Sequence, residues 1–282
     1  MSGRIDQKKI VVIGAAGALG SYFTHEIRLS REDLNITDTM KMKDIMRRLR
    51  PQVVVHLAAV TDMKLCEEDP EMAERVNGLA TENIATAARD IGARVVYIST
   101  NAVFDGEKAA PYAPTDEPHP VSVYGRSKRR GEIAVLASDP RNLVIRTSWI
   151  FGGGPSHDRK FVGKMLPKLL SGEAVKAIGD VRGTPTYGRD LAKAVEQLMQ
   201  DGASGIVHVV NAGNASRYDM AALVRDVIGS KSDVESVPQS AFPGTGNTLR
   251  NEMLDAEKNT LRPWQEALAE YIRDEWKISI KG

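Results

Sequence analysis

The sequence predicts an α/β fold in which a doubly wound parallel sheet carries a small C-terminal lobe. Short β-branched and aliphatic runs alternate with amphipathic helical stretches, which is the pattern of a parallel sheet covered on both faces. A glycine-rich turn follows the first run directly, and two irregular, glycine-rich segments come only after the fourth. We therefore expect a Rossmann-like domain over residues 1–150, with residues 151–282 forming the lobe and returning helices to the core.

The elements follow from these runs in chain order. In the first domain we expect strands over residues 9–14, 52–58, 94–100 and 142–149. Between them we expect helices over residues 17–28, 39–49, 69–92 and 121–138. Later strands are expected at 175–179 and 206–211, and later helices near 187–200, 217–228 and 263–275, with Ser216 and Asp219 spaced as a helix start. The second strand of such a sheet must be very short or absent, because the residues available for it largely finish the first helix.

Two loops after the fourth strand are candidates for binding a substrate. Residues 152–160 are too rich in glycine for a regular element, and residues 179–186 form a turn-rich loop. Both should emerge at the carboxyl ends of the strands, where open parallel sheets bind their ligands. We expect them to form the substrate lobe, with ordinary solvent loops as the alternative.

Composition narrows the class of protein. Lysine plus arginine (38) nearly cancels aspartate plus glutamate (37), so nothing points to nucleic acid or to an anionic membrane as a partner. The single cysteine, Cys66, cannot form an internal disulfide and fits a reducing cytoplasm. Its acidic neighbours should raise the pKa of its thiol, which argues against a nucleophile. The histidines are scattered, and no apolar run approaches a membrane span, so we expect a cytoplasmic protein without a metal.

The glycine-rich turn predicts a dinucleotide site. Gly14 should allow the tight turn after the first strand, Gly17 should let the backbone approach the phosphates, and Gly20 should permit close packing of helix on strand. The N-terminus of a helix starting near Gly17 is then expected to hold the pyrophosphate.

A second motif places a phenol and an ammonium on one face of a helix. Tyr124 is suited to give a proton to a carbonyl oxygen, and Lys128, one turn along, should lower the pKa of the phenol. Lys128 is also placed to hydrogen-bond the nicotinamide ribose. Ser99 and Thr100 end a buried strand, where a hydroxyl can polarise the same oxygen. With the dinucleotide turn, these residues predict hydride transfer to or from a carbonyl.

These motifs together resemble the extended short-chain dehydrogenase/reductases and, among them, the dTDP-4-dehydrorhamnose reductase family. The similar segments span nearly the whole chain and are Arg50–Ala59, Val76–Asn83, Tyr97–Phe104, Val123–Lys128, Arg146–Phe151, Gly183–Ala192 and Pro263–Leu268. The resemblance implies a reductase acting on the 4-keto group of a nucleotide-linked 4-keto-6-deoxy sugar, with NADP or NAD as cofactor.

The resemblance also implies roles for individual residues. The catalytic set would be Thr100, Tyr124 and Lys128. Implied cofactor contacts are Gly14, Gly17, Ala18, Leu19, Gly20, Asn35, Ile36, Ala58, Ala59, Thr61 and Lys128. Trp149 matches a tryptophan that packs on the sugar, and core packing is the alternative for it. Arg28 and Arg31 could meet a 2′-phosphate, which slightly favours NADPH, although surface arginines are often only solvated.

The chain departs from the family pattern at several of these positions. Asn101-Ala102 stand where the family usually has Asp-Tyr contacting the sugar, so the sugar or its configuration could differ. Lys160 replaces an asparagine, and Lys160 and Arg182 could each bind a substrate phosphate. An aspartate expected at position 35 is missing. Tyr22 stands where some members place a magnesium-binding glutamate, so we predict no such metal.

Two other functions stay open at this point. An epimerase with recycled NAD shares the fold and the catalytic set, whereas a dehydratase usually needs an acid where Asn101 stands. The fold also occurs in a catalytically silent regulatory subunit that binds methionine adenosyltransferase. The nucleotide base, the sugar configuration and the choice of NAD or NADP are left open, as is a homodimer.

Overall fold

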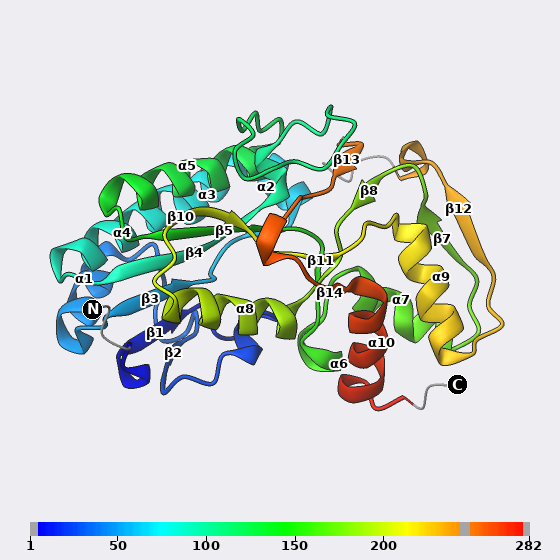
Figure 1. The fold of residues 1–282 in the computed structure, drawn as a ribbon, viewed down its shortest axis with the longest axis horizontal. Helices are drawn as coiled ribbons and strands as arrows, with labels where there is room; N and C mark the ends of the chain where they lie inside the picture. Colours follow the sequence, from blue (N-terminus) through cyan, green and yellow to red (C-terminus); the bar gives the residue numbers. More distant parts are fainter. Residues whose placement is uncertain (1–4, 243–248, 279–282) are drawn as a thin grey trace.

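A six-stranded parallel sheet forms the centre of the computed structural model, which describes residues 5–242 and 249–278 (Figure 1). The strands lie in the order β10-β5-β4-β3-β1-β2 and every neighbouring pair is parallel. Their bounds are β1 Ile10–Ile13, β2 Ile27–Leu29, β3 Val53–His56, β4 Arg94–Thr100, β5 Leu143–Thr147 and β10 Gly205–His208. The predicted α/β, Rossmann-like fold is confirmed. The strand order reverses between β1 and β3, where such sheets bind ligands.

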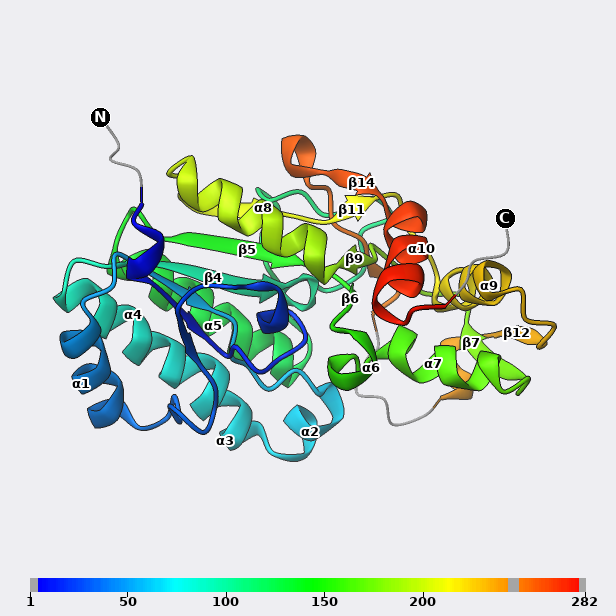
Figure 2. The same ribbon diagram turned by 90° about the horizontal axis from the view of Figure 1, so that it is seen from below.

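Helices cover both faces of the sheet. Figure 2 shows α1 (Thr39–Leu49), α4 (Ala80–Asp90) and α5 (Val123–Ser138) on one side and α8 (Gly188–Gln200) on the other. The predicted ranges of α1, α5 and α8 are confirmed to within a few residues. In α1, the side chain of Asp38 accepts from the Lys41 N–H, which caps the helix start.

The helix expected over residues 17–28 is wrong. Between β1 and β2 the structure has only the 3-10 helix η2 (Gly20–Tyr22), and Ile27–Leu29 form the very short second strand. A parallel connection must carry the chain back along the sheet, and the residues between Ile13 and Ile27 are too few for that return plus a helix of normal length. Phe23 is fully buried against β1 and α8 and fills part of the face that this helix would cover.

The helix expected over residues 69–92 is interrupted. It consists of α3 (Pro70–Ala73), a π-helical turn η3 (Glu74–Leu79) and α4. The π turn presents Asn77, whose amide accepts from the Val60 N–H and donates to the Val60 oxygen, both at 2.9 Å. This wide turn therefore fixes the loop that leaves β3, consistent with the frequent occurrence of π turns near functional sites.

The C-terminal lobe is built on a small parallel pair, β7 (Val175–Ile178) with β12 (Val234–Val237). The helices α7 (Phe161–Leu170), α9 (Arg217–Ile228) and α10 (Trp264–Glu275) pack with it in one hydrophobic cluster. The predicted helices near 217–228 and 263–275 are confirmed, and Ser216 and Asp219 form a capping box.

The loops expected to lack regular structure carry short elements instead. The helix α6 (Gly154–His157) lies within residues 152–160, and three consecutive glycines with positive φ, Gly152–Gly154, lead into it. The strands β8 (Arg182–Gly183) and β9 (Thr186–Tyr187) occupy the second loop or its end. The remaining elements are α2 (Met63–Glu68), β6 (Ile150–Phe151), β11 (Asn211–Ala212), β13 (Asn251–Glu252), β14 (Leu261–Pro263) and the 3-10 helices η1 (Gln7–Lys9), η4 (Asn101–Val103), η5 (Gln239–Ala241) and η6 (Glu257–Asn259).

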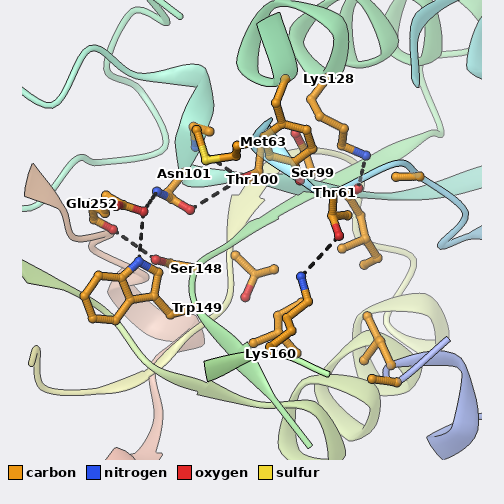
Figure 3. A pocket seen from close by; sticks show the side chains of 18 of the residues that line it. Thr61, Met63, Ser99, Thr100, Asn101, Lys128, Ser148, Trp149, Lys160 and Glu252 are labelled. Carbon is orange, nitrogen blue, oxygen red and sulfur yellow. Dashed lines mark hydrogen bonds between the residues drawn. The ribbon is translucent and has the colours of Figure 1, made fainter. Parts of the chain in front are cut away.

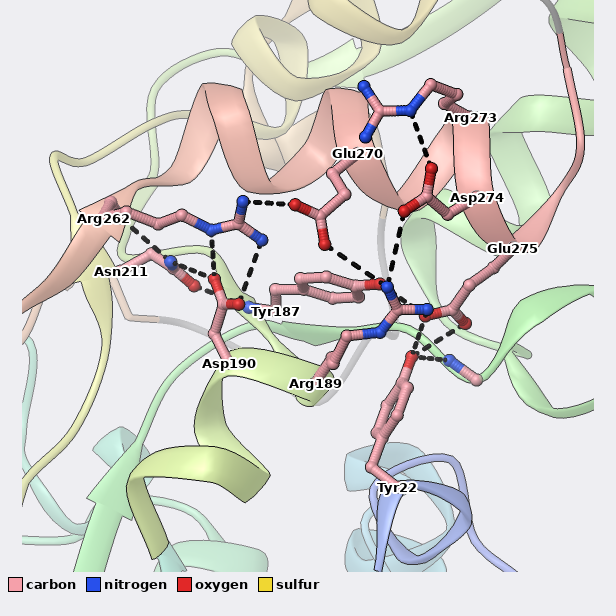
Figure 4. A network of polar contacts seen from close by, with 11 residues as sticks. Tyr22, Tyr187, Arg189, Asp190, Asn211, Arg262, Glu270, Arg273, Asp274 and Glu275 are labelled. Atoms are coloured by element: carbon pink, nitrogen blue, oxygen red, sulfur yellow. Dashed lines mark hydrogen bonds and ion pairs between the residues drawn. The ribbon is translucent and has the colours of Figure 1, made fainter. Parts of the chain in front are cut away.

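A polar network joins the glycine-rich turn to the last helix (Figure 4). The Tyr22 hydroxyl hydrogen-bonds both carboxylate oxygens of Glu275, at 2.8 and 2.9 Å, and accepts from the Gly153 N–H. The Tyr187 hydroxyl donates to the same carboxylate, and the Arg189 guanidinium forms an ion pair with this carboxylate at 3.2 Å. Residues that are far apart in the sequence thus hold η2 in place.

Three further predictions can be compared with the described residues. Cys66 is buried, and burial together with Asp62 and Glu67 raises the pKa of its thiol to about 11, as expected from its acidic setting. Within residues 5–242 and 249–278, no group of three or more histidine, cysteine, aspartate or glutamate side chains is arranged to hold a metal ion. No helix in the same ranges is long and apolar enough to cross a membrane.

Candidate active site

A cavity of about 380 Å³ opens at the carboxyl ends of the sheet strands (Figure 3). Its wall contains the glycine-rich turn, the loop after β3, the end of β4, the start of α5 and parts of the C-terminal lobe. The predicted site residues that line it are Gly14, Gly17, Ala18, Leu19, Gly20, Ala59, Thr61, Thr100, Asn101, Ala102, Tyr124, Lys128, Trp149 and Lys160. Residues from the predicted cofactor, catalytic and substrate sets therefore share one cavity.

The glycine-rich turn packs directly against the loop that follows β3. Gly14 has a φ of +88°, and a Cβ there would lie 2.6 Å from the Ala58 nitrogen. A Cβ on Gly20 would lie 2.6 Å from two backbone oxygens of the same turn. At Gly17 a Cβ would meet nothing closer than 3.5 Å, so the packing of the protein itself does not require a glycine at this position. Gly17 is instead open to a ligand, as a phosphate cradle requires.

The turn does not have the N-terminus of a long helix beside it. The expected placement of a pyrophosphate on such a helix is therefore wrong, because only the three-residue η2 follows. A guanidinium lies next to the turn instead: Arg28, from β2, donates to the Ala15 oxygen at 3.3 Å and the Gly20 oxygen at 3.4 Å. The backbone of the turn still fits the diphosphate of a nicotinamide dinucleotide.

Close helix packing brings Tyr124 next to Thr100. The side chain of Ser122 accepts from the Gly125 N–H and caps α5, so Tyr124 lies in its first turn. A Cβ on Gly125 would lie only 2.0 Å from the Ala102 oxygen, so only glycine lets α5 approach the end of β4 this closely. The Thr100 hydroxyl accepts from the Ala102 N–H at 3.1 Å and donates to Asn101 Oδ1 at 3.3 Å.

The pKa values of Tyr124 and Lys128 differ from those that the sequence led us to expect. Burial raises the pKa of the Tyr124 phenol to about 12, while its hydrogen bond with Thr100 acts in the opposite direction. The Lys128 ammonium is directed to other groups: its Nζ donates to the Ile98 oxygen at 2.7 Å and lies 4.0 Å from the centre of the Tyr97 ring. Burial lowers the pKa of Lys128 to about 7, opposed by Glu132. Tyr124 is therefore protonated at neutral pH, as a proton donor must be.

Ser99 also lines the cavity, but its hydroxyl has a structural partner. It donates to Glu132 at 2.6 Å, and that carboxylate also receives two hydrogen bonds of 2.8 Å from Arg146. Glu132 and Arg146 are almost completely buried. This pair ties α5 to β4 and β5 below the cavity, which leaves Thr100 facing the phenol.

The end of the cavity near Trp149 contains residues that the sequence did not reveal. Glu252, from β13, accepts hydrogen bonds from Asn101 and from the Trp149 indole, and Arg217 stacks on that indole. Met63 also lines the cavity (Figure 3). No local motif marks these positions, because Glu252 and Arg217 reach the site only through the packing of the C-terminal lobe.

The remaining predicted residues lie in different places. Lys160 lines the cavity and its Nζ donates to Thr61 at 3.2 Å, while burial lowers its pKa. Arg182 is not part of this wall and pairs with Asn214 and Asp219. Asn35 is exposed and Ile36 is buried; both lie in the connection between β2 and α1, and neither lines the cavity.

The similarity to known proteins extends over almost the whole chain. The family described as the RmlD substrate binding domain matches residues 8–276. A dTDP-4-dehydrorhamnose reductase of Mycobacterium tuberculosis is 34% identical over 95% of this chain and 93% of its own length. The spore coat polysaccharide biosynthesis protein SpsK of Bacillus subtilis is 32% identical, over 94% of this chain and 97% of that protein.

A solved structure agrees with the observed fold. The dTDP-4-dehydrorhamnose reductase of Bacillus anthracis in complex with NADP superposes with a TM-score of 0.89 at 26% identity, covering 94% of this chain and 98% of that one. The cavity geometry and the match over residues 8–276 lead to one conclusion. The chain belongs to the RmlD substrate binding domain family, as the resemblance of its motifs to the dTDP-4-dehydrorhamnose reductases implied.

Proposed function

We propose that this protein reduces the 4-keto group of a nucleotide-linked 4-keto-6-deoxy sugar, with NADPH or NADH as the reductant. The observation that carries the proposal is the single cavity in which the glycine-rich turn meets Thr100, Tyr124 and Lys128. The names of the relatives make dTDP-4-dehydrorhamnose the first substrate to test. A dinucleotide bound in this cavity would supply the hydride.

The residues of the chain have separate tasks in this reaction. Tyr124 gives its proton to the oxygen of the carbonyl group. Its raised pKa keeps the phenol protonated at neutral pH, so the proton is available. Thr100 orients the phenol and hydrogen-bonds the same oxygen. Lys128 lies one helical turn from Tyr124 at the base of the cavity, from which it can hydrogen-bond the ribose next to the nicotinamide.

The cofactor would occupy the side of the cavity formed by the first domain. Gly14, Gly17, Ala18, Leu19 and Gly20 line the cavity and would hold the diphosphate. Ala59 and Thr61, which also line it, and Ala58, against which Gly14 packs, would contact the nicotinamide half. Asn35 and Ile36 follow β2 and would contact the adenine. Arg28 favours NADPH, because a guanidinium beside the turn can accommodate a 2′-phosphate.

The substrate would enter from the C-terminal lobe, which we assign to residues 151–282. Lys160 is placed to bind a substrate phosphate as a point charge close to Thr61. Arg182 remains a candidate for a more distant phosphate or base contact. We expect a cytoplasmic protein, since its one cysteine is a buried thiol, and a homodimer is compatible with this assignment.

Cofactor oxidation tests this function. Loss of absorbance at 340 nm is followed with NADPH or NADH and dTDP-4-dehydrorhamnose, with Tyr124→Phe as the control. We expect turnover that falls on the order of 10²–10⁴-fold in the variant, the usual scale of general acid catalysis. Cofactor binding without turnover would redirect the search to other 4-keto sugars. Absence of cofactor binding would favour a regulatory protein over an enzyme.

A further inference from the structure

The ammonium group of Lys128 is buried without a counter-ion beside it. Lys128 belongs to α5 and is only 2% exposed, yet it lines the cavity (Figure 3). No carboxylate of the described residues lies within 4.0 Å of its Nζ, and Glu132 pairs with Arg129 and Arg146 instead. A buried charge is costly unless it is paired or hydrogen-bonded. The contacts that stabilise this ammonium must therefore come from uncharged groups.

Two such contacts come from neighbouring residues of β4. The Nζ of Lys128 donates to the Ile98 oxygen at 2.7 Å. The same nitrogen lies 4.0 Å from the centre of the Tyr97 ring, within the range of a cation–π interaction. The face of an aromatic ring attracts a cation because its π electrons make it negative. An ammonium has three N–H donors, so one carbonyl and one ring face leave at least one donor for a ligand in the cavity.

The Tyr97 ring is fixed by its own neighbours. It is fully buried and stacks on His56 of β3, with the ring centres 5.3 Å apart. On α5, Gly131 makes room for the ring, because a Cβ there would lie 2.5 Å from the Tyr97 hydroxyl. In such close packing the ring cannot turn away, so it presents a constant face to the Lys128 ammonium.

The titratable groups around Lys128 are neutral at pH 7, apart from Glu132. Burial raises the pKa of the Tyr97 phenol well above its usual value and raises the pKa of Tyr124 to about 12. Burial, with the charge of Lys128, lowers the pKa of His56 to about 3. The Tyr97 ring therefore acts on the ammonium through its π electrons and not as a phenolate. This contact favours the charged form of Lys128, against the burial that lowers its pKa to about 7.

We propose that Tyr97 is a positioning residue for Lys128, because its ring face holds the ammonium, keeps it charged and directs it toward the ribose of the cofactor. Tyr97 is not part of the cavity wall, so it acts only through Lys128. This rests on the proposed function, because it takes the ribose next to the nicotinamide as the ligand of Lys128.

Binding of NADP+ to two variants of Tyr97 provides the first test. Phenylalanine keeps the ring, whereas leucine fills part of the same volume without a π face. In calorimetric titrations at pH 8.5, the dissociation constant should be about tenfold higher for Tyr97→Leu than for Tyr97→Phe, the size of a buried cation–π contact. Tyr97→Phe should stay within about twofold of the wild type. At pH 6 the two variants should differ by only about twofold, because the higher proton concentration restores the ammonium.

The pH dependence separates positioning from packing. A void left by the leucine would weaken NADP+ binding to the same extent at pH 6 and at pH 8.5, since packing does not depend on a proton at Lys128. That result would overturn the proposal. Equal dissociation constants for Tyr97→Leu and Tyr97→Phe at pH 8.5 would also overturn it, because the ring would then contribute nothing to cofactor binding.

A series of rings of nearly constant shape keeps the proposal testable if Tyr97→Leu does not fold. Phenylalanines with one, two or three ring fluorines are incorporated at position 97, since each fluorine withdraws π electrons with little change in size. NADP+ binding at pH 8.5 should weaken stepwise, by about tenfold over the series. The same series at Phe151, a buried ring that stacks on Tyr187, is the matched control and should leave NADP+ binding unchanged. Constant affinity across the series at position 97 would contradict the proposal.

Titration of Lys128 without any cofactor separates failure of this proposal from failure of the proposed function. Lysine labelled with carbon-13 at Cε reports the charge of each ammonium by NMR, and Lys128→Met assigns the signal. The pKa of Lys128 should fall by about one between Tyr97→Phe and the trifluorinated ring, which corresponds to the tenfold change in affinity. This result would support the role of Tyr97 even if no 4-keto sugar were reduced. The same pKa in both proteins would overturn it.

Discussion

The two ends of the cavity are held together in different ways. At the catalytic end, the capped helix α5, the bare backbone of Gly125 and the end of β4 place Tyr124 beside Thr100 through local geometry. At the cofactor end, the turn has no long helix behind it and is fixed by Tyr22, which reaches Glu275 in the last helix (Figure 4). The catalytic end depends on regular secondary structure, whereas the cofactor end depends on the C-terminal lobe.

The largest effect is expected from Gly125→Ala at the catalytic end. The added Cβ would lie 2.0 Å from the Ala102 oxygen, so α5 must move away from β4 and carry Tyr124 with it. We expect kcat to fall by about 10²-fold or more, the scale associated with a displacement near 1 Å.

The matched control is Gly17→Ala at the cofactor end. A Cβ there meets no protein atom closer than 3.5 Å, so the fold should be kept while the KM for NADPH rises. Steady-state kinetics with both substrates distinguish these outcomes. Equal losses of kcat in the two variants would contradict the assignment of separate roles to the two ends.

Removing the hydroxyl of Tyr22 should loosen the cofactor end. Tyr22→Phe loses the hydrogen bonds to Glu275 and Gly153, and bonds to a charged group contribute about 1.5–3 kcal/mol. Urea unfolding should show a decrease of that size in the free energy of unfolding. Tyr218→Phe, on α9 and outside this network, is the control. Two variants of equal stability would show that the contact with α10 does not hold the turn.

The smallest effect, taken per pH unit, is a pH dependence at the catalytic end. Burial lowers the pKa of Lys128 to about 7, so between pH 7 and its unfolded value near ~10.4 the unfolded chain binds a proton that the folded protein does not. Stability from this group is therefore present at high pH and is lost as the pH falls toward 7. The wild type should gain up to about 1.4 kcal/mol per pH unit over Lys128→Met in this window.

Chemical unfolding of both proteins at pH 7.5, 8.5 and 9.5 measures the difference. The same slope in wild type and Lys128→Met would mean that Lys128 keeps an ordinary pKa in the folded protein. Such a result would leave its charge available to lower the pKa of Tyr124, as the sequence alone suggested.

The sequence predicted the catalytic end better than the cofactor end, for a physical reason. The Tyr124–Lys128 spacing, the strand ending in Thr100 and the helical pattern over residues 121–138 are local patterns, and local patterns survive folding. The first crossover failed because a glycine-rich turn after a strand normally implies a helix, and here the chain between β1 and β2 is too short for one. Its support comes from Glu275, at the other end of the chain.

The difference between local patterns and tertiary packing also applies to the part of the cavity near Trp149. Trp149 and Lys160 were found because they belong to recognisable segments, and both line the cavity. Glu252 and Arg217 were missed because only tertiary packing brings them there. The π turn at Asn77 was also missed, since one extra residue in a helical turn leaves no clear signal in the hydrophobic period.

The most direct test of the central claim follows the hydride itself. NADPH carrying deuterium at both hydrogen positions of the nicotinamide C4 is incubated with the protein and dTDP-4-dehydrorhamnose, and the sugar product is examined by NMR and mass spectrometry. We predict one deuterium on C4 of the sugar, one NADPH oxidised per sugar reduced, and neither with Tyr124→Phe. A product that carries no deuterium, or an unchanged cofactor with an altered sugar, would contradict reduction at C4 and point to epimerisation with recycled cofactor.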